Sequence, residues 1–210
     1  MIKPSTVSVD YCFSVASPWT YLGSARFIEM VDRYGLHVNV LPLDYTRVFA
    51  STGGLMYEKR APQRREYRQV ELARWREHLD IPLTLEPRYY PVDRTPASCL
   101  LIAARAQPRQ ALSLSHAILR TIWRDDGDIA DWGVLKSLCD EVGLDGLALV
   151  EAAQRPEVAA RYEQDTDAAI AAGVFGAPSY LIDGEIFWGQ DRLAFVERRI
   201  AGLVQRAAAR

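Results

Sequence analysis

The sequence predicts an α/β fold that is interrupted by a long all-helical segment. Strand patterns occur only toward the two ends of the chain, at residues 6–14, 36–43 and 177–189. Between them, from about residue 60 to residue 172, helical patterns rich in charge and alanine follow one another without a strand. With 49% hydrophobic residues in 210, the chain has enough apolar side chain to bury a sizeable core.

The N-terminal part predicts a strand, a helix and a second strand. Residues 6–14 alternate and contain β-branched and aromatic side chains, which is typical of a strand. Pro18 then occupies a first helical position, and apolar residues recur at helical spacing until Gly35, where we expect the helix to end. The run LHVNVLPL, residues 36–43, supplies the second strand. This order predicts a parallel pair with a right-handed crossover.

The C-terminal part predicts a hairpin followed by a helix. Asp183-Gly184 joins two short apolar runs and suits a tight turn. Asp191 stands where a cap or first-turn acid of the closing helix belongs. The apolar stripe of that helix contains Leu193, Val196, Ile200 and Leu203.

Within the middle segment, residues 66–79 predict a helix with a broad apolar face. Its arginines are interpreted as a solvated face. The apolar face contains Val70, Leu72, Ala73, Trp75 and Leu79. Together the elements predict a thioredoxin-like fold with a large all-helical insertion domain. We expect residues 1–45 and 173–210 to form the thioredoxin-like domain and residues 46–172 the helical insertion domain.

Composition narrows the function classes. A net charge of −2 does not indicate the excess of positive charge typical of nucleic-acid-binding proteins, and no apolar run is long enough to cross a bilayer. The N-terminus lacks the pattern of a secretory signal, so we expect a cytoplasmic protein. Three isolated cysteines suit a reducing compartment, and three isolated histidines predict no metal site. These residues are Cys12, Cys99, Cys139, His37, His78 and His116.

The stretch SVASPWTYLG, residues 14–23, places Ser17 directly before the first helical proline. One interpretation is a plain helix N-cap, for which serine is among the best residues. The other is a site for a ligand's thiolate, because the free N–H groups and dipole of a helix N-terminus favour negative charge. A dithiol redox cycle is excluded at this motif, since Ser17 is not acidic like a thiol and Thr20 cannot close a disulfide.

The stretch GVFGAPSYLIDG, residues 173–184, places Pro178 directly before a strand. Pro178 is either an ordinary trans proline or part of a cis Ala177-Pro178 bond. In the cis form we expect the bond to face the Ser17 turn, with the backbone of Ala177 free to pair with a peptide-like ligand.

Residues 14–23, 70–83 and 161–193 resemble the 2-hydroxychromene-2-carboxylate isomerases, relatives of the kappa-class glutathione transferases in the DsbA-like thioredoxin superfamily. The shared signatures are Ser-Pro-x-Thr-Tyr-Leu and Phe-Gly-x-Pro with Phe-Trp-Gly-x-Asp-Arg, and the resemblance covers nearly the entire chain. They distinguish this group from DsbA enzymes that keep their cysteines. The resemblance implies a homodimeric enzyme of aromatic-compound catabolism that uses glutathione.

Site residues follow from the same resemblance. It implies that Ser17 holds the glutathione thiol, that Ala177 and Pro178 pair with the cysteinyl backbone, and that Gln190 and Asp191 bind the γ-glutamyl end. Lys59 or Arg60 lies near the glycine end, and one of them or a nearby arginine would hold the carboxylate of an aromatic pyruvate. Ring contacts inferred from proximity are Trp19, Tyr21, Phe49 and Tyr57.

Three departures from the family pattern concern the substrate more than the glutathione site. Ser14 stands where relatives carry aspartate, Lys59 and Arg60 stand near an expected Asn-Lys-Pro-Pro, and Asp93 replaces an expected asparagine. Two alternatives to the isomerase therefore stay open. One is a kappa-like transferase that consumes glutathione, and the other is a thiol oxidoreductase or noncatalytic binding module that uses Cys12.

Overall fold

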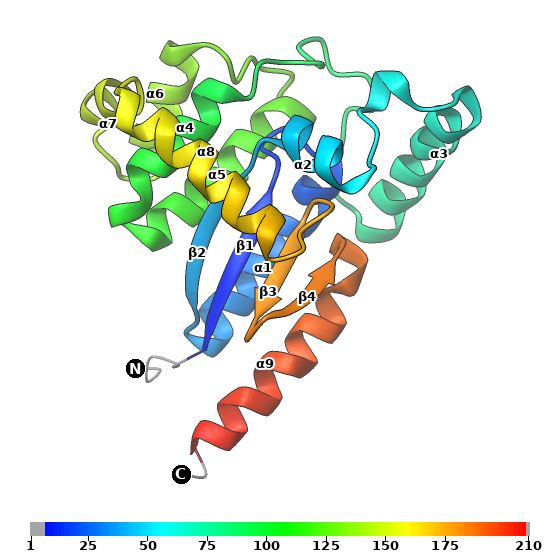
Figure 1. Ribbon diagram of the computed structural model, residues 1–210. Helices are drawn as coiled ribbons and strands as arrows, with labels where there is room; N and C mark the ends of the chain where they lie inside the picture. The colour runs from blue at the N-terminus through cyan, green and yellow to red at the C-terminus, as the bar shows by residue number, and fades with distance from the viewer. Residues whose placement is uncertain (1–6, 209–210) are drawn as a thin grey trace.

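The computed structural model describes residues 7–208 of the chain and contains a four-stranded mixed sheet between helices (Figure 1). The strands are β1 (Ser8–Phe13), β2 (His37–Pro42), β3 (Ser179–Ile182) and β4 (Glu185–Trp188), in the spatial order β2-β1-β3-β4. β1 and β2 are parallel, whereas β3 is antiparallel to both β1 and β4. The predicted parallel pair is confirmed, although Thr6 lies outside the described residues.

The helices fill the chain between β2 and β3 and also follow β1 and β4. The α-helices are α1 (Pro18–Tyr34), α2 (Tyr45–Thr52), α3 (Pro62–Leu79), α4 (Thr95–Ala103), α5 (Pro108–Trp123), α6 (Trp132–Glu141), α7 (Gly146–Ala153), α8 (Pro156–Ala171) and α9 (Leu193–Ala208). Short 3₁₀ turns are η1 (Tyr57–Lys59), η2 (Ala104–Ala106) and η3 (Gln190–Arg192). None of these helices is long and apolar enough to cross a membrane.

The ends of α1 follow from local chemistry. Ser17 is the N-cap, and Pro18 at the first helical position has no N–H that would need a partner. Gly35 ends the helix with a φ of 60°, a left-handed conformation that glycine adopts without steric cost. The predicted start and stop of this helix are confirmed.

The hairpin between β3 and β4 turns on the predicted two residues. Asp183 and Gly184 have φ values of 50° and 79°, as a type I′ turn requires at both central positions. The turn returns β4 along β3 and brings η3 back to the N-terminal half of α1. Gly23 permits this approach, because a Cβ at that position would lie 2.9 Å from the Cβ of Gln190.

The sheet and the inserted helices share one apolar core. Tyr11 stacks on Phe13 and Tyr180 with ring centroids 4.5 and 5.4 Å apart, and Phe27 of α1 packs against the same rings. This cluster continues without a break into side chains of α4, α5 and α6. A smaller cluster on the other face of the sheet joins β1 to α2 and α8. The division at residues 45/46 and 172/173 remains a prediction.

The predicted surface of α3 is wrong at two positions. Leu72 is fully buried as expected, but Val70 is 45% exposed and Arg68 is only 8% exposed. The reason is that α3 lies at the edge of the molecule, apart from the other long helices (Figure 1). It therefore buries a narrow strip in which Arg68 and Leu72 lie one turn apart, and not a broad apolar face.

Candidate active site

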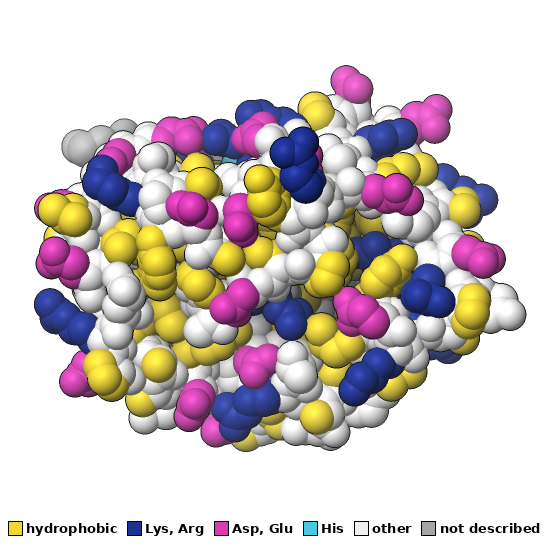
Figure 2. All heavy atoms as spheres, turned by 90° about the horizontal axis from the view of Figure 1, so that it is seen from above, with side chains coloured by type: hydrophobic (Ala, Val, Ile, Leu, Met, Phe, Trp, Pro, Cys, Tyr) yellow, Lys and Arg dark blue, Asp and Glu magenta, His cyan; other side chains and the backbone are white. Residues whose placement is uncertain are grey.

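A cavity of about 1040 Å³ lies between the N-terminus of α1, the segment from α2 to α3, and the loop before β3. Figure 2 shows the molecule hollowed on this upper face, with hydrophobic and basic side chains around the hollow. Eight of the residues singled out from the sequence line it, from segments far apart in the chain. They are Ser17, Trp19, Phe49, Tyr57, Arg60, Ala177, Gln190 and Asp191.

Ser17 caps α1 and also faces the cavity. Its Oγ accepts a hydrogen bond from the backbone N–H of Thr20 at 3.2 Å, and its own N–H donates to the carbonyl of Ser14 at 3.1 Å. The cap uses only a lone pair of the hydroxyl. No acceptor for the hydroxyl proton occurs within residues 7–208, so Ser17 retains a donor for a ligand at the positive end of the helix.

The loop opposite Ser17 presents open backbone. The Ala177-Pro178 bond is cis, and the Pro178 carbonyl accepts from the N–H of Gly189 at 2.8 Å. The Gly176 carbonyl accepts from the hydroxyls of Tyr45 at 3.0 Å and Ser179 at 2.7 Å, which fixes the loop. The peptide groups of Ala177 have no partner in the described part of the chain. They are therefore available to an extended ligand.

Gln190 and Asp191 lie on η3 at one end of the cavity. Gln190 is 2% exposed, and its side-chain carbonyl accepts from the guanidinium of Arg26, which holds it in place. Asp191 lies in the first turn of η3, and its Oδ2 accepts from Arg192 at 2.6 Å. Its other oxygen lacks a hydrogen-bond partner among the described residues, so the carboxylate has room for a ligand cation.

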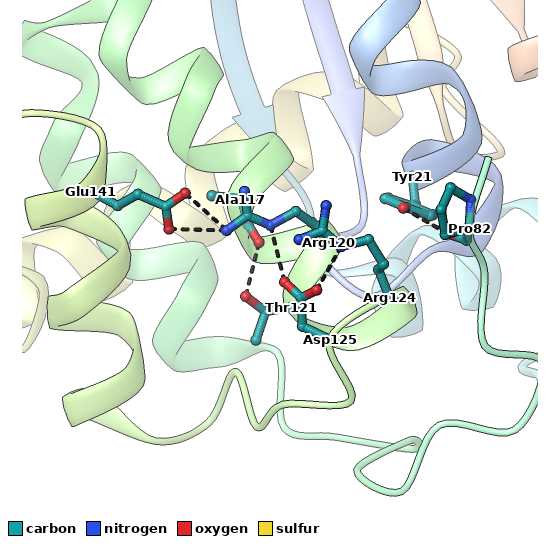
Figure 3. Close-up of polar contacts among 8 residues, drawn as sticks. All are labelled: Tyr21, Pro82, Ala117, Arg120, Thr121, Arg124, Asp125 and Glu141. Atoms are coloured by element: carbon teal, nitrogen blue, oxygen red, sulfur yellow. Dashed lines mark hydrogen bonds and ion pairs between the residues drawn. The ribbon is translucent and has the colours of Figure 1, made fainter.

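Three residues singled out from the sequence do not line the cavity. Lys59 is exposed on η1, and of the cis pair Ala177-Pro178 only Ala177 lines the cavity. Tyr21 is buried on another side of α1, where its hydroxyl donates to the Pro82 carbonyl at 2.8 Å (Figure 3). Its ring stacks on His116 with centroids 6.2 Å apart. Tyr21 therefore joins the helices and does not face a ligand in this cavity.

The cavity also contains residues that sequence reasoning did not single out. Phe175 and Trp188 form an exposed edge-to-face pair with centroids 4.8 Å apart. Arg68 and Tyr90 form part of another wall. No local pattern identifies Arg68, because a helical arginine among other arginines ordinarily faces solvent.

The departures Ser14 and Asp93 differ in location. Ser14 is 7% exposed at the end of β1, lines the cavity and accepts from the N–H of Ala16 at 3.4 Å. Asp93 is exposed and accepts from the N–H of Thr95 at 2.9 Å, which ties it to the start of α4. Of the two, only Ser14 adjoins the space beside Ser17.

The cysteines do not provide redox chemistry in the cavity. Cys12, Cys99 and Cys139 are free and buried. Burial raises the pKa of the Cys12 thiol strongly, and Asp10 and Asp165 raise it further, so the reactive thiolate is suppressed. Within residues 7–208, no group of three or more His, Cys, Asp or Glu side chains could hold a metal ion.

Comparison with known proteins agrees with the thioredoxin-like sheet described above. The family model described as a DSBA-like thioredoxin domain matches residues 8–201. The chain is 30% identical over 198 residues to a 2-hydroxychromene-2-carboxylate isomerase of Sphingobium xenophagum, covering 91% of this chain and 97% of the relative. Human glutathione S-transferase kappa 1 is 22% identical over 206 residues, covering 90% of this chain and 89% of that protein.

A solved structure supports the same relationship. The structure of a 2-hydroxychromene-2-carboxylate isomerase in selenomethionine form superposes with a TM-score of 0.82 at 25% identity, covering 96% of this chain and 98% of that one. The chain therefore belongs to the DsbA-like thioredoxin family and, within it, to the 2-hydroxychromene-2-carboxylate isomerases, a family of enzymes.

Proposed function

We propose that this enzyme is a glutathione-dependent isomerase that interconverts 2-hydroxychromene-2-carboxylate and trans-o-hydroxybenzylidenepyruvate. The observation that carries the proposal is the meeting of two groups in one cavity. These are the unshared hydroxyl proton of Ser17 and the open peptide groups of Ala177. The names of the curated relatives support the reaction, and the relationship to a glutathione transferase supports the cofactor.

The residues present fit glutathione in charge and in shape. An extended tripeptide can pair with the Ala177 backbone as an added strand would, which directs its cysteinyl sulfur toward Ser17. Asp191 can accept from the ammonium of the γ-glutamyl end, and Arg60, which also lines the cavity, can receive the glycyl carboxylate. A volume of about 1040 Å³ leaves space for a second, aromatic ligand.

Glutathione, when bound, supplies a thiol nucleophile that adds reversibly to a conjugated carbon and is recovered when the double bond re-forms. Ser17 contributes by donating its hydroxyl proton as a hydrogen bond to the sulfur anion, and the N-terminal N–H groups of α1 add positive potential. Together these effects lower the pKa of a bound thiol by on the order of one unit. Trp19, Phe49 and Tyr57 line the cavity and can contact the substrate ring.

The test follows glutathione during turnover of trans-o-hydroxybenzylidenepyruvate. We expect no isomerisation without glutathione, saturable isomerisation with it, and a constant free-thiol concentration throughout the reaction. A thiol that disappears in proportion to substrate would instead identify a transferase. An activity that does not need glutathione would overturn the proposal.

A further inference from the structure

Arg68 of α3 is the most deeply buried charged group around the cavity. Its side chain enters an aromatic cage that we define as Tyr57, Tyr90 and Trp123. The guanidinium carbon lies 4.6 Å from the Tyr57 ring centroid, 5.9 Å from that of Tyr90 and 6.0 Å from that of Trp123. These distances are within the range of cation–π attraction.

No carboxylate pairs directly with this charge in the described part of the chain, and Glu58 attracts it only from beyond ion-pair distance. Arg68 forms no ion pair, whereas Arg74 on the same helix pairs with Glu71 at 2.7 Å. Burial lowers the pKa of the Arg68 guanidinium, yet an arginine stays protonated in proteins. A buried charge without a partner is costly, and three ring faces compensate only part of the lost hydration.

The charged side chains that line the cavity have an excess of positive charge. Glu71 and Asp191 line it, but each already pairs with an arginine. Arg60, Arg64, Arg68 and Arg94 also line it and have no carboxylate partner among the residues described. The cavity is therefore suited to ligands that carry more negative than positive charge.

We propose that Arg68 is the specificity-determining residue that binds the carboxylate of the electrophilic substrate, with the conjugated part of that substrate against Tyr57 and Tyr90, the two rings of the cage that line the cavity. A guanidinium presents two parallel N–H donors to a carboxylate, and the flat faces of Tyr57 and Tyr90 at the cavity wall suit a planar unsaturated acid. The substrate class is an aromatic or conjugated carboxylic acid.

This assignment rests on the proposed function in placing the substrate beside bound glutathione. The burial of Arg68 separates its role from that of Arg60. Arg60 lies directly after η1, where its Nε donates to the Leu55 carbonyl at 2.9 Å in an exposed contact, and a peptide terminus can reach it from solvent. Arg68 is 8% exposed and surrounded by rings, which suits a flat ligand that enters the cavity completely.

The first experiment measures binding of trans-cinnamate, an aromatic carboxylate, and of its neutral amide to wild type, Arg68→Met and the matched control Arg76→Met. Arg76 lies exposed on the same helix, donates to the Leu83 carbonyl at 3.2 Å and does not line the cavity. We expect wild type and Arg76→Met to prefer the carboxylate by at least about thirtyfold, and Arg68→Met to lose this preference. Arg68→Lys, which keeps the charge without the paired donors, should retain a weaker preference.

The second experiment measures turnover and glutathione affinity of the same variants. We expect Arg68→Met to raise KM for trans-o-hydroxybenzylidenepyruvate by at least about thirtyfold, with a smaller change in kcat and an unchanged Kd for glutathione. An unchanged carboxylate preference in Arg68→Met and Arg68→Lys would overturn the assignment. A matching loss of glutathione affinity would also overturn it, because Arg68 would then bind the tripeptide. If wild type binds cinnamate through Arg68 but does not catalyse the isomerisation, the anion site is supported and only the proposed reaction is refuted.

Discussion

Replacing Ser17 by alanine should lower turnover in a pH-dependent manner while leaving the fold intact. The change removes the cap bond to the N–H of Thr20 and the proton donor that faces the cavity. Loss of the cap costs about 1 kcal/mol of the free energy of unfolding. Asp131→Ala is the matched control, because Asp131 caps α6 through the N–H groups of Gly133 and Val134 and does not line the cavity.

The catalytic magnitude follows from the ionisation of the bound thiol. Lowering the pKa of an ordinary thiol from about 8.5 to about 7.5 raises its thiolate fraction at pH 7 from about 3% to about 24%. Loss of the Ser17 donor should reverse part of this gain, by up to about eightfold, which is equivalent to about 1.2 kcal/mol. Above a pH of about 9 both enzymes hold mostly thiolate, so the difference should nearly vanish.

The assay is the rate of isomerisation at saturating glutathione over a range of pH, for wild type, Ser17→Ala and Asp131→Ala. The apparent pKa of the ascending limb should rise in Ser17→Ala only, by up to about one unit. Asp131→Ala should lose a similar amount of stability and keep the wild-type profile. A Ser17→Ala profile that coincides with wild type, or one reduced equally at every pH, would refute the thiolate role.

Three further outcomes are expected. Burial, with Arg120 and Arg124, lowers the pKa of His116. The free energy of unfolding should therefore fall as pH drops below about 6.5, because the unfolded chain binds a proton that the folded chain does not. His116→Gln should reduce this pH dependence of the unfolding free energy in denaturant titrations. Cys12 should resist thiol-specific reagents until the protein unfolds, and rapid labelling of the native protein would contradict its burial. Asp191→Asn should weaken glutathione binding by about tenfold but leave binding of a des-amino analogue unchanged, and equal losses for both ligands would exclude contact with the ammonium.

The sequence predicts those parts of the fold that depend on local chemistry. Ser17 and Pro18 define the start of α1, and Gly35 defines its end. Asp183 and Gly184 define the hairpin because both must adopt a positive φ. Each helix end and turn depends on backbone groups within a few residues, so the identity of the neighbouring residues is enough to predict it.

Side-chain direction at the site was harder to predict because proximity in sequence does not determine it. Trp19 and Tyr21 are two residues apart, but two steps along an α-helix rotate the direction by about 200°. Trp19 consequently lines the cavity, whereas Tyr21 packs against His116. Lys59 and Arg60 likewise separate at the end of a 3₁₀ turn, and only Arg60 lines the cavity.

Arg68 shows a different limit of sequence reasoning. Its burial depends on Tyr57, Tyr90 and Trp123, which belong to three separate segments and meet only in the folded chain. Composition and periodicity favour a solvated arginine at such a position. The tertiary arrangement changes a common surface residue into a buried cation without an ion pair among the described residues, and from this feature we infer the substrate's carboxylate.

Titration of the enzyme with glutathione at pH 7, with thiolate absorbance and proton release measured together, tests the central claim most directly. We predict that binding ionises a substantial fraction of the thiol and releases the corresponding protons. S-methylglutathione should bind without either signal, and Ser17→Ala should bind glutathione with both signals reduced. Absence of binding, or binding of glutathione as the neutral thiol, would contradict a cavity built around Ser17 and Ala177 to hold a thiolate.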